Sequence, residues 1–371
     1  MKTSLLFGVA LAGLLAHSAL AGPVKLTDYQ LNAVVAGTDF QVANLIADRP
    51  NIAPTTDPDL VNAWGLSSAP GGPLWVANNG TGTSTVYDPN SFAKLGLTVS
   101  IPGPDGGPAA PTGTVFTSLT ASDFAVSQGG KTGHSIFLFD TEDGTISGWS
   151  PSVNGTQAII AVNDSTTGAV FKGLTIAPVQ HSQYLYAADF ANNRVDMFNG
   201  QFQQIGSFTD ASLPAGYAPF NVQTLNGLVY VAFAKHGEGL DEAHGHGLGY
   251  VDIYTTHGQF VRRLVASGPL NAPWGLAIAP ASFGEFAGAL LVGNFGSGVI
   301  TAFNATTGAY MGQLKDNGKP VVIPGLWALA QGPDGEIIFS SGPNDEANGL
   351  VGAIRPAAAA ASWASRAHAT R

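Results

Sequence analysis

Six times along this chain, a short apolar strand that begins near an aromatic residue or a glycine is followed by a second strand, a polar turn and a third strand. The clearest copies start at residues 64–66 and 274–276, both with the sequence Trp-Gly-Leu. A four-stranded unit that recurs about every 50 residues is typical of a β-propeller blade. The repeat therefore predicts an all-β, six-bladed β-propeller. The expected innermost-strand anchors are Leu66, Val126, Leu174, Val222, Leu276 and Leu329, with spacings of 60, 48, 48, 54 and 53 residues.

The composition agrees with this fold class. The 48 glycines and 23 prolines among 371 residues supply many tight turns, and the apolar segments are short. Beyond the N-terminus no stretch carries apolar residues at the 3.6-residue period of a long amphipathic helix. Because radial repeats form one body at this size, we expect a single domain over residues 22–356.

An N-terminal strand is expected to close the ring. Residues 40–46 (Phe-Gln-Val-Ala-Asn-Leu-Ile) precede the first inner strand and have a strand-like pattern. The end of the chain supplies three further strands, around residues 327–329, 337–339 and 351–354. Pairing of 40–46 with the last of these completes the sixth blade and removes exposed sheet edges.

The first residues have the pattern of a secretory signal peptide over 1–21. Lys2 gives a positive start, residues 5–16 are apolar, and residues 19–21 (Ala-Leu-Ala) form a small-residue cleavage site. The apolar run is shorter than the roughly 20 residues that a membrane span needs. The protein is therefore expected to be secreted or periplasmic, with no disulfides because it has no cysteine. The Ala-rich stretch 357–371 is interpreted as a low-complexity tail.

The charge balance narrows the expected partners. Lys and Arg number 15 against 25 Asp and Glu, a formal net charge of -10, and the basic residues are scattered. A nucleic-acid surface needs clustered cations, so this class of partner is excluded. Only 11% of the residues are charged, which predicts a neutral, polar surface. We expect a monomer without a transmembrane segment that binds a small molecule, a glycan or a protein.

One segment resembles an NHL repeat: residues 185–195 read Leu-Tyr-Ala-Ala-Asp-Phe-Ala-Asn-Asn-Arg-Val, with the Ala-Asp and Asn-Arg pairs on either side of a turn. Over 40–356 the order of motifs also resembles a bacterial family of secreted β-propellers of unassigned function. The pieces that carry this resemblance are 60–66, 141–149 and 271–276. Some members of that family end in a membrane sorting helix, which this chain lacks. The resemblance implies an NHL/TolB-like propeller fold and brings no activity with it.

The ligand-binding residues are expected on one face of the ring. In a propeller, the loops that join the second and third strands lie on the same face as the loops that enter the inner strands. This places the polar residues Asn78, Asp189, Asn193 and Asn294 on that face. The alternative is that these Asn and Asp residues only form turns.

Tryptophans at the starts of inner strands are a second candidate feature. Trp64, Trp274 and Trp327 could form an aromatic collar for a sugar or another flat ligand. The alternative is packing between blades.

The loop 236–246 is unlike the short turns of the other repeats, because it holds three histidines and three carboxylates within eleven residues. Imidazole and carboxylate groups suit divalent metals, here Zn, Mn, Ni or Ca. The expected ligands are His236, Asp241, His244 and His246, with a solvated lid as the alternative.

Two functions remain open from the sequence, and the catalytic residues, if any, are unknown. Metal-dependent six-bladed lactonases resemble this chain in architecture, but they carry Asn or Asp just before Gly-Leu, where this chain has tryptophans and Lys172. There is no Gly-x-Ser-x-Gly elbow, phosphate loop or dinucleotide fingerprint. A secreted, non-catalytic binding propeller is the favoured hypothesis. The alternative is a metal-dependent hydrolase or lyase that acts on a small extracellular molecule.

Overall fold

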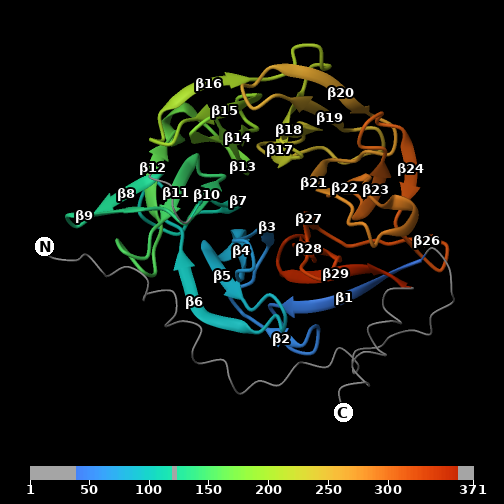
Figure 1. The fold of residues 1–371 in the computed structure, drawn as a ribbon, viewed down its shortest axis with the longest axis horizontal. Coiled ribbons are helices and arrows are strands. Elements are labelled where there is room, and N and C mark those ends of the chain that lie inside the picture. Colours follow the sequence, from blue (N-terminus) through green and yellow to red (C-terminus); the bar gives the residue numbers. More distant parts are fainter. Residues whose placement is uncertain (1–38, 119–122, 358–371) are drawn as a thin grey trace, which may run out of the picture. The chain divides into compact units, whose positions relative to one another are not determined.

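A computed structural model describes residues 39–118 and 123–357, which form six blades of four antiparallel strands around a central axis (Figure 1). The sheet of one blade has a short fifth strand, Thr55–Thr56, that pairs in parallel. The six-bladed propeller predicted from the repeat is confirmed. The expected signal peptide (1–21) and residues 358–371 of the expected tail lie outside the described residues. In the two described ranges, no helix has both the length and the apolar character that crossing a membrane requires.

The first three blades follow one another along the chain, each from the centre outward. The first consists of β3 (Ala63–Ser68), β4 (Leu74–Asn78), β5 (Thr83–Tyr87) and β6 (Lys94–Ser100). The second consists of β7 (Pro111–Phe116), β10 (Phe137–Thr141), β11 (Thr145–Trp149) and β12 (Ile159–Asn163). The third consists of β13 (Phe171–Val179), β14 (Ser182–Asp189), β15 (Arg194–Phe198) and β16 (Gln204–Phe208).

The remaining blades continue the ring. The fourth consists of β17 (Tyr217–Leu225), β18 (Leu228–Lys235), β19 (Tyr250–Tyr254) and β20 (Phe260–Ala266). The fifth consists of β21 (Pro273–Ile278), β22 (Leu290–Asn294), β23 (Val299–Phe303) and β24 (Tyr310–Gln313). The sixth consists of β27 (Leu326–Gln331), β28 (Ile337–Ser341), β29 (Leu350–Pro356) and the N-terminal β1 (Phe40–Ala47). Short elements lie outside this pattern: β2 (Thr55–Thr56), β8 (Ala125–Gln128), β9 (Lys131–His134), β25 (Lys315–Asp316), β26 (Lys319–Pro320), and the 3-10 turns Asn79–Thr81, Ser165–Thr167 and Gly284–Phe286.

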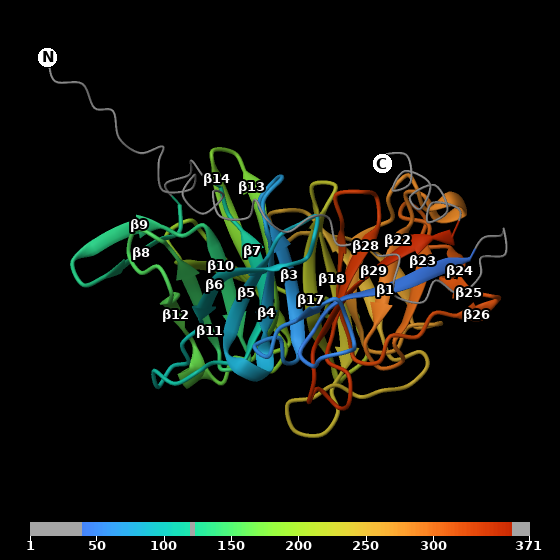
Figure 2. The same ribbon diagram turned by 90° about the horizontal axis from the view of Figure 1, so that it is seen from below.

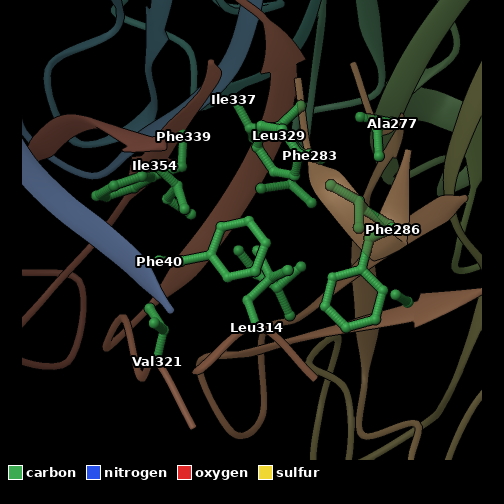
Figure 3. Packing of buried hydrophobic residues seen from close by; sticks show 14 of the residues in the cluster. Phe40, Ala277, Phe283, Phe286, Leu314, Val321, Leu329, Ile337, Phe339 and Ile354 are labelled. Atoms are coloured by element: carbon green, nitrogen blue, oxygen red, sulfur yellow. The ribbon is translucent and has the colours of Figure 1, made fainter. Parts of the chain in front are cut away.

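The N-terminal strand closes the ring as predicted. Strand β1 pairs antiparallel with β29 from Phe40 opposite Pro356 to Ala47 opposite Leu350. The side chain of Phe40 is buried between the fifth and sixth blades, and its ring centroid lies 5.2 Å from that of Phe283 and 5.9 Å from that of Phe286 (Figure 3). The closure is therefore held by apolar packing as well as by the strand ladder.

The anchor predicted for the second blade was wrong. Val126 lies on β8, which forms a hairpin with β9 and packs against β11 and β12 of the same blade. The inner strand is β7, where Thr114 takes the position that Leu66 has in the first blade. The sequence of β7, Pro-Thr-Gly-Thr-Val-Phe, is too polar to match the apolar template, whereas Val126 is buried and apolar. The hairpin is an insertion between the first and second strands of this blade.

Every inner strand has a register shift near its start, where an extra residue opposes the neighbouring strand. A bulge of this kind changes the direction of a side chain. At this position the six inner strands carry Trp64, Thr112, Lys172, Phe220, Trp274 and Trp327. The residue that follows is often glycine, and a Cβ on Gly113 would lie 2.4 Å from the backbone nitrogen of Leu174 in the next blade. The blades therefore approach closely around the axis.

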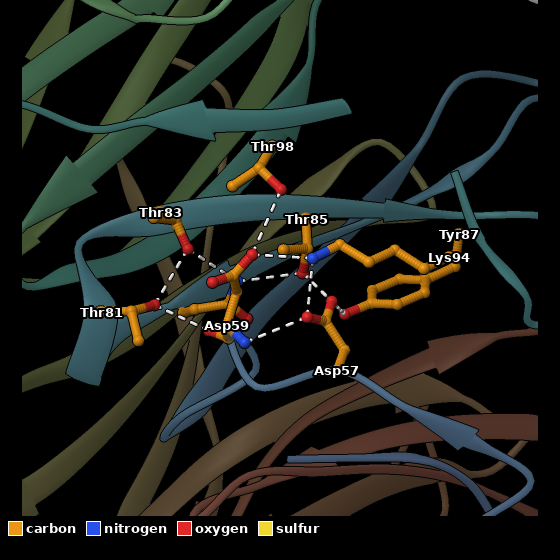
Figure 4. Close-up of polar contacts among 9 residues, drawn as sticks. Asp57, Asp59, Thr81, Thr83, Thr85, Tyr87, Lys94 and Thr98 are labelled. Atoms are coloured by element: carbon orange, nitrogen blue, oxygen red, sulfur yellow. Dashed lines mark hydrogen bonds and ion pairs between the residues drawn. The ribbon is translucent and has the colours of Figure 1, made fainter. Parts of the chain in front are cut away.

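The segment between β1 and β3 is fastened to the first blade by Asp57, whose side chain is fully buried (Figure 4). The hydroxyl of Tyr87 donates to Oδ2 of Asp57 at 2.6 Å, and Nζ of Lys94 donates to Oδ1 at 2.7 Å. Lys94 also donates to Asp59 at 2.7 Å. Burial, together with the charge of Asp57, raises the pKa of Tyr87, so its hydroxyl remains a donor. This network has a structural role, at the junction of the sixth and first blades.

Candidate functional site

The loops between second and third strands meet the loops that enter the inner strands on one face of the propeller, and the longest of them joins β18 to β19 (Figure 2). Between them is a cavity of about 1120 Å³, here called the loop-face cavity. It has an acidic rim and an aromatic floor. Its lining is Trp64, Glu142, Lys172, Gly237, Glu238, Asp241, Glu242, Ala243, His244, Phe295, Pro324, Gly325, Trp327, Gly342, Asn344, Asp345 and Glu346.

Aromatic rings fill the centre of the ring below this cavity. Trp327 is stacked between Trp64, at a centroid distance of 3.5 Å, and Phe295, at 3.9 Å. Trp274 meets both Trp64 and Trp327 edge to face, and Phe220 packs against Trp327. We call Trp64, Phe220, Trp274 and Trp327 the central plug. Its members are at most 4% exposed, so the three tryptophans proposed as an open collar instead pack against one another.

Lys172 occupies the same bulge position on β13 and is 2% exposed. Its Nζ donates to Oε1 of Glu142 at 2.5 Å. The ammonium group also lies 5.5 Å from the ring centroid of Trp64 and 5.9 Å from that of Phe190. A carboxylate and two aromatic faces thus replace the water that burial removes from this charge.

A chain of hydrogen bonds connects the central plug to the rim of the cavity. Nε1 of Trp327 donates to Oδ1 of Asn62 at 3.0 Å, and Nδ2 of Asn62 donates to Oε2 of Glu346 at 2.6 Å. The same amide donates to Oδ1 of Asn79, whose own amide donates to Oε2 of Glu142 at 2.8 Å. Two rim carboxylates are therefore held in place by the floor. Sequence reasoning missed the part played by Asn62, because its partners are up to 284 residues away.

The carboxylates of the cavity influence one another. Burial raises the pKa of Glu346 to about 6, and the charges of Glu142 and Glu242 add to the shift. Hydrogen bonding to Glu242, at 3.1 Å, raises the pKa of His244. The cavity thus concentrates negative charge in a partly desolvated space.

The long loop is held by local contacts of its histidines. His236 packs against Phe190 at 4.3 Å and bonds Oδ1 of Asn193 through Nε2 at 2.9 Å, while burial lowers its pKa. His244 bonds Glu242, and His246 is exposed. Over 39–118 and 123–357, no three His, Asp or Glu side chains are placed to hold a metal ion together. The residues proposed as metal ligands, including Asp241, therefore do not converge in this structure.

The polar residues predicted from the repeat lie at blade turns. Asn78, Asp189 and Asn294 are fully buried and make their hydrogen bonds inside the protein. Oδ1 of Asn294, for example, accepts from the backbone nitrogen of Asn271 at 2.9 Å. The fourth residue, Asn193, contacts the long loop through His236. None of these four belongs to the lining of the loop-face cavity.

Asp140 on β10 gives a testable dependence of stability on pH. Its side chain is fully buried, and Oδ1 accepts from Oγ1 of Thr112 at 2.9 Å and from the backbone nitrogen of Gly113 at 2.6 Å. Burial nevertheless raises its pKa to about 7. Because the unfolded chain releases this proton near pH 4, the folded state binds more protons between pH 4 and 7. The free energy of unfolding should therefore fall as the pH rises through this window, by up to about 4 kcal/mol.

Thermal melts of Asp140→Asn between pH 4 and 8 test this assignment. In the variant, stability should fall much less as the pH rises toward 7. The exposed Asp105→Asn variant should behave like the native protein, because Asp105 bonds only its own turn. An identical pH profile for the native protein and Asp140→Asn would contradict the assignment.

A six-bladed propeller with a cavity on one face and a filled centre is the class that this fold and site define. No family model matches the chain. Uncharacterized protein R648 of Acanthamoeba polyphaga mimivirus is 34% identical over 332 residues, covering 86% of this chain and 81% of the relative. The chain belongs to the family of this protein. The relatives found are viral proteins, so the bacterial family named from the sequence gains no support from them.

Solved structures agree on the fold. A glucose dehydrogenase structure matches with a TM-score of 0.52 and 12% identity, covering 84% of this chain and 99% of that one. A streptogramin B lyase structure matches with a TM-score of 0.51 and 12% identity, covering 87% of this chain and all of that one. These neighbours are enzymes, but at such identity the likeness shows the propeller fold alone.

Proposed function

We propose that this protein is a binding propeller that holds a ligand in the loop-face cavity without transforming it. The observation that carries the proposal is the cavity itself: about 1120 Å³, lined by loops, with the central plug below it. Small-molecule sites are typically concave, with an apolar floor and a few placed polar groups. Here the hydrogen bonds that run from Trp327 to Glu346 fix some of those groups.

Non-catalytic binding is favoured because the ionisable groups beside the central plug are occupied with each other. Lys172 and Glu142 form a close ion pair, and Oε2 of Glu142 accepts from Asn79. A general acid or base needs a proton position that is open to the ligand. The alternative is a metal-dependent hydrolase or lyase, and a test of binding has to distinguish it from a non-catalytic binding protein.

Export forms part of this proposal. The signal-peptide pattern of residues 1–21 would deliver a mature chain that begins at Gly22 to the periplasm or the medium. The motifs at 60–66, 141–149 and 271–276 add a likeness to secreted propellers. Mass spectrometry of the extracytoplasmic fraction tests this point, and a soluble cytoplasmic form that retains Met1 would contradict it.

Filling the cavity tests the binding function. Ala243 lines the cavity, so Ala243→Trp places an indole inside it. Ala281 is exposed on the β21–β22 connection, at the opposite ends of the strands, and Ala281→Trp is the matched control. The probe is a thermal-shift panel of sugars, amino acids, polyamines and nucleotides, with Ca²⁺, Mn²⁺, Ni²⁺ and Zn²⁺ salts.

We expect at least one organic compound to raise the melting temperature of the native protein and of Ala281→Trp, and to have no effect on Ala243→Trp. Stabilisation by metal salts alone would favour the metal-dependent enzyme. Equal stabilisation of both variants, or stabilisation by no compound, would overturn the proposal.

A further inference from the structure

We propose that the ligand of the loop-face cavity is a small organic cation with two or more ammonium groups, an inference that rests on the proposed binding function. The first observation is the charge of the lining. Two basic side chains, Lys172 and His244, share the lining with six carboxylates, and His244 carries a charge only when protonated. The six are Glu142, Glu238, Asp241, Glu242, Asp345 and Glu346.

The pairing of these charges leaves several carboxylates without a counterion. Lys172 is paired with Glu142, and His244 with Glu242. Among the described residues, the other four carboxylates form no ion pair within 4 Å. Carboxylates gathered at a partly desolvated site attract cations and repel anions. More than one positive charge on the ligand is needed to balance them.

A second observation concerns the floor. Nε1 of Trp274 donates to the backbone oxygen of Lys172 at 2.7 Å, and Nε1 of Trp327 donates to Asn62. Nε1 of Trp64, a residue that is 1% exposed and lines the cavity, has no hydrogen-bond partner in the described residues. A buried N–H without an acceptor is costly. Because this nitrogen is covered in the structure, we expect a ligand that binds on the floor to shift the covering rings and offer it an oxygen or a neutral nitrogen. The ligand is therefore expected to carry an acceptor as well as its ammonium groups.

The floor also shows how this site accommodates an ammonium group. The charge of Lys172 is held by one carboxylate and two aromatic faces. Phe295, which is partly exposed and lies 5.4 Å from the ring of His244, offers another aromatic face beside the rim carboxylates. Ammonium groups favour this combination of π-face and carboxylate.

The size of the cavity distinguishes an organic cation from a bare metal ion. About 1120 Å³ is far more space than one ion occupies, and no three ligand side chains in the described ranges converge on a point. Two sources share the required chemistry: a linear polyamine and an oligosaccharide of glucosamine. Spermine represents the first, and a glucosamine tetramer represents the second.

Isothermal titration of the full-length protein tests the inference with these two probes. The fully N-acetylated tetramer is the matched neutral ligand, because acetylation removes the charges and keeps the sugar rings. The double variant Asp345→Asn/Glu346→Gln removes two unpaired carboxylates at the rim, and Glu285→Gln removes an exposed one on the β21–β22 connection.

We expect spermine or the glucosamine tetramer to bind, and the neutral tetramer to bind at least about tenfold more weakly. The double variant should lose about tenfold in affinity for the cation, and Glu285→Gln should match the native protein. Raising the salt from 20 to 200 mM should weaken binding of the cation, because screening acts on the charges. The cationic probe that binds more tightly identifies the source of the ligand, a polyamine or an oligosaccharide of glucosamine.

Two results separate failure of this inference from failure of the proposed function. A neutral sugar that binds as tightly as the cations, and is blocked by Ala243→Trp, would overturn the cationic ligand and leave the binding function intact. If no compound is blocked by Ala243→Trp, the binding function fails as well. If the double variant binds the cation as tightly as the native protein does, the cation binds outside the loop-face cavity and the inference is wrong.

Discussion

Deletion of residues 23–48 is expected to lower the melting temperature by about 10 °C or more, or to cause aggregation. The deletion removes β1, whose pairing with β29 completes the sixth blade, and with it the buried ring of Phe40. Loss of a buried phenylalanine alone costs about 3–5 kcal/mol, and β29 would be left as an unpaired edge. Differential scanning calorimetry and light scattering measure both effects.

The matched deletion of residues 23–38 retains β1 and isolates the contribution of the strand. Most of the loss in melting temperature should appear with the 23–48 deletion and be absent with the 23–38 deletion. Equal stability of the 23–48 deletion and the native protein would show that β1 does not close the ring.

Trp327→Ala is expected to destabilise the protein by about 4 kcal/mol. Trp327 is stacked between Trp64 and Phe295, and its Nε1 holds Asn62. The substitution leaves a void in the central plug and frees the amide that positions Glu346. Chemical denaturation should show the loss, and cation binding should weaken with it.

Trp327→Phe is the control for Trp327→Ala, because a smaller ring retains stacking and loses the hydrogen bond. It should destabilise less than alanine. A loss below about 1 kcal/mol for Trp327→Ala would mean that the plug contributes little to the fold.

The fold was predictable from the sequence because every blade of a propeller repeats the same pattern of strands. The Trp-Gly-Leu pieces at 64–66 and 274–276 mark inner strands, and 40–46 was identified as the closing strand. The second blade was misread because β7 is polar and the inserted hairpin carries the apolar Val126. The polar Thr112 is tolerated on this buried strand because its hydroxyl is hydrogen-bonded to Oδ1 of Asp140.

The site was predictable only in its location. The alternation of antiparallel strands places the loop 236–246 on the face where ligand-binding residues were expected, and this loop contributes to the cavity together with Glu142. The sequence could not show that Trp64 and Trp327 stack on each other, or that Asn62 reaches Glu346, because these contacts join distant parts of the ring. The repeat pattern also predicted Asp189 as a ligand-binding residue, whereas its side chain is buried and hydrogen-bonded in its own turn.

The most direct test of the central claim, that the loop face holds the ligand, is hydrogen exchange of the full-length protein. Exchange is measured by mass spectrometry with and without whichever of spermine and the glucosamine tetramer binds more tightly. A smaller cavity of about 320 Å³ at the other ends of the inner strands, lined in part by residues 223–226, provides the internal comparison. We predict slower exchange in 236–246 and 342–348, with no change in 223–226. Protection of 223–226 without protection of the loop face would contradict the account.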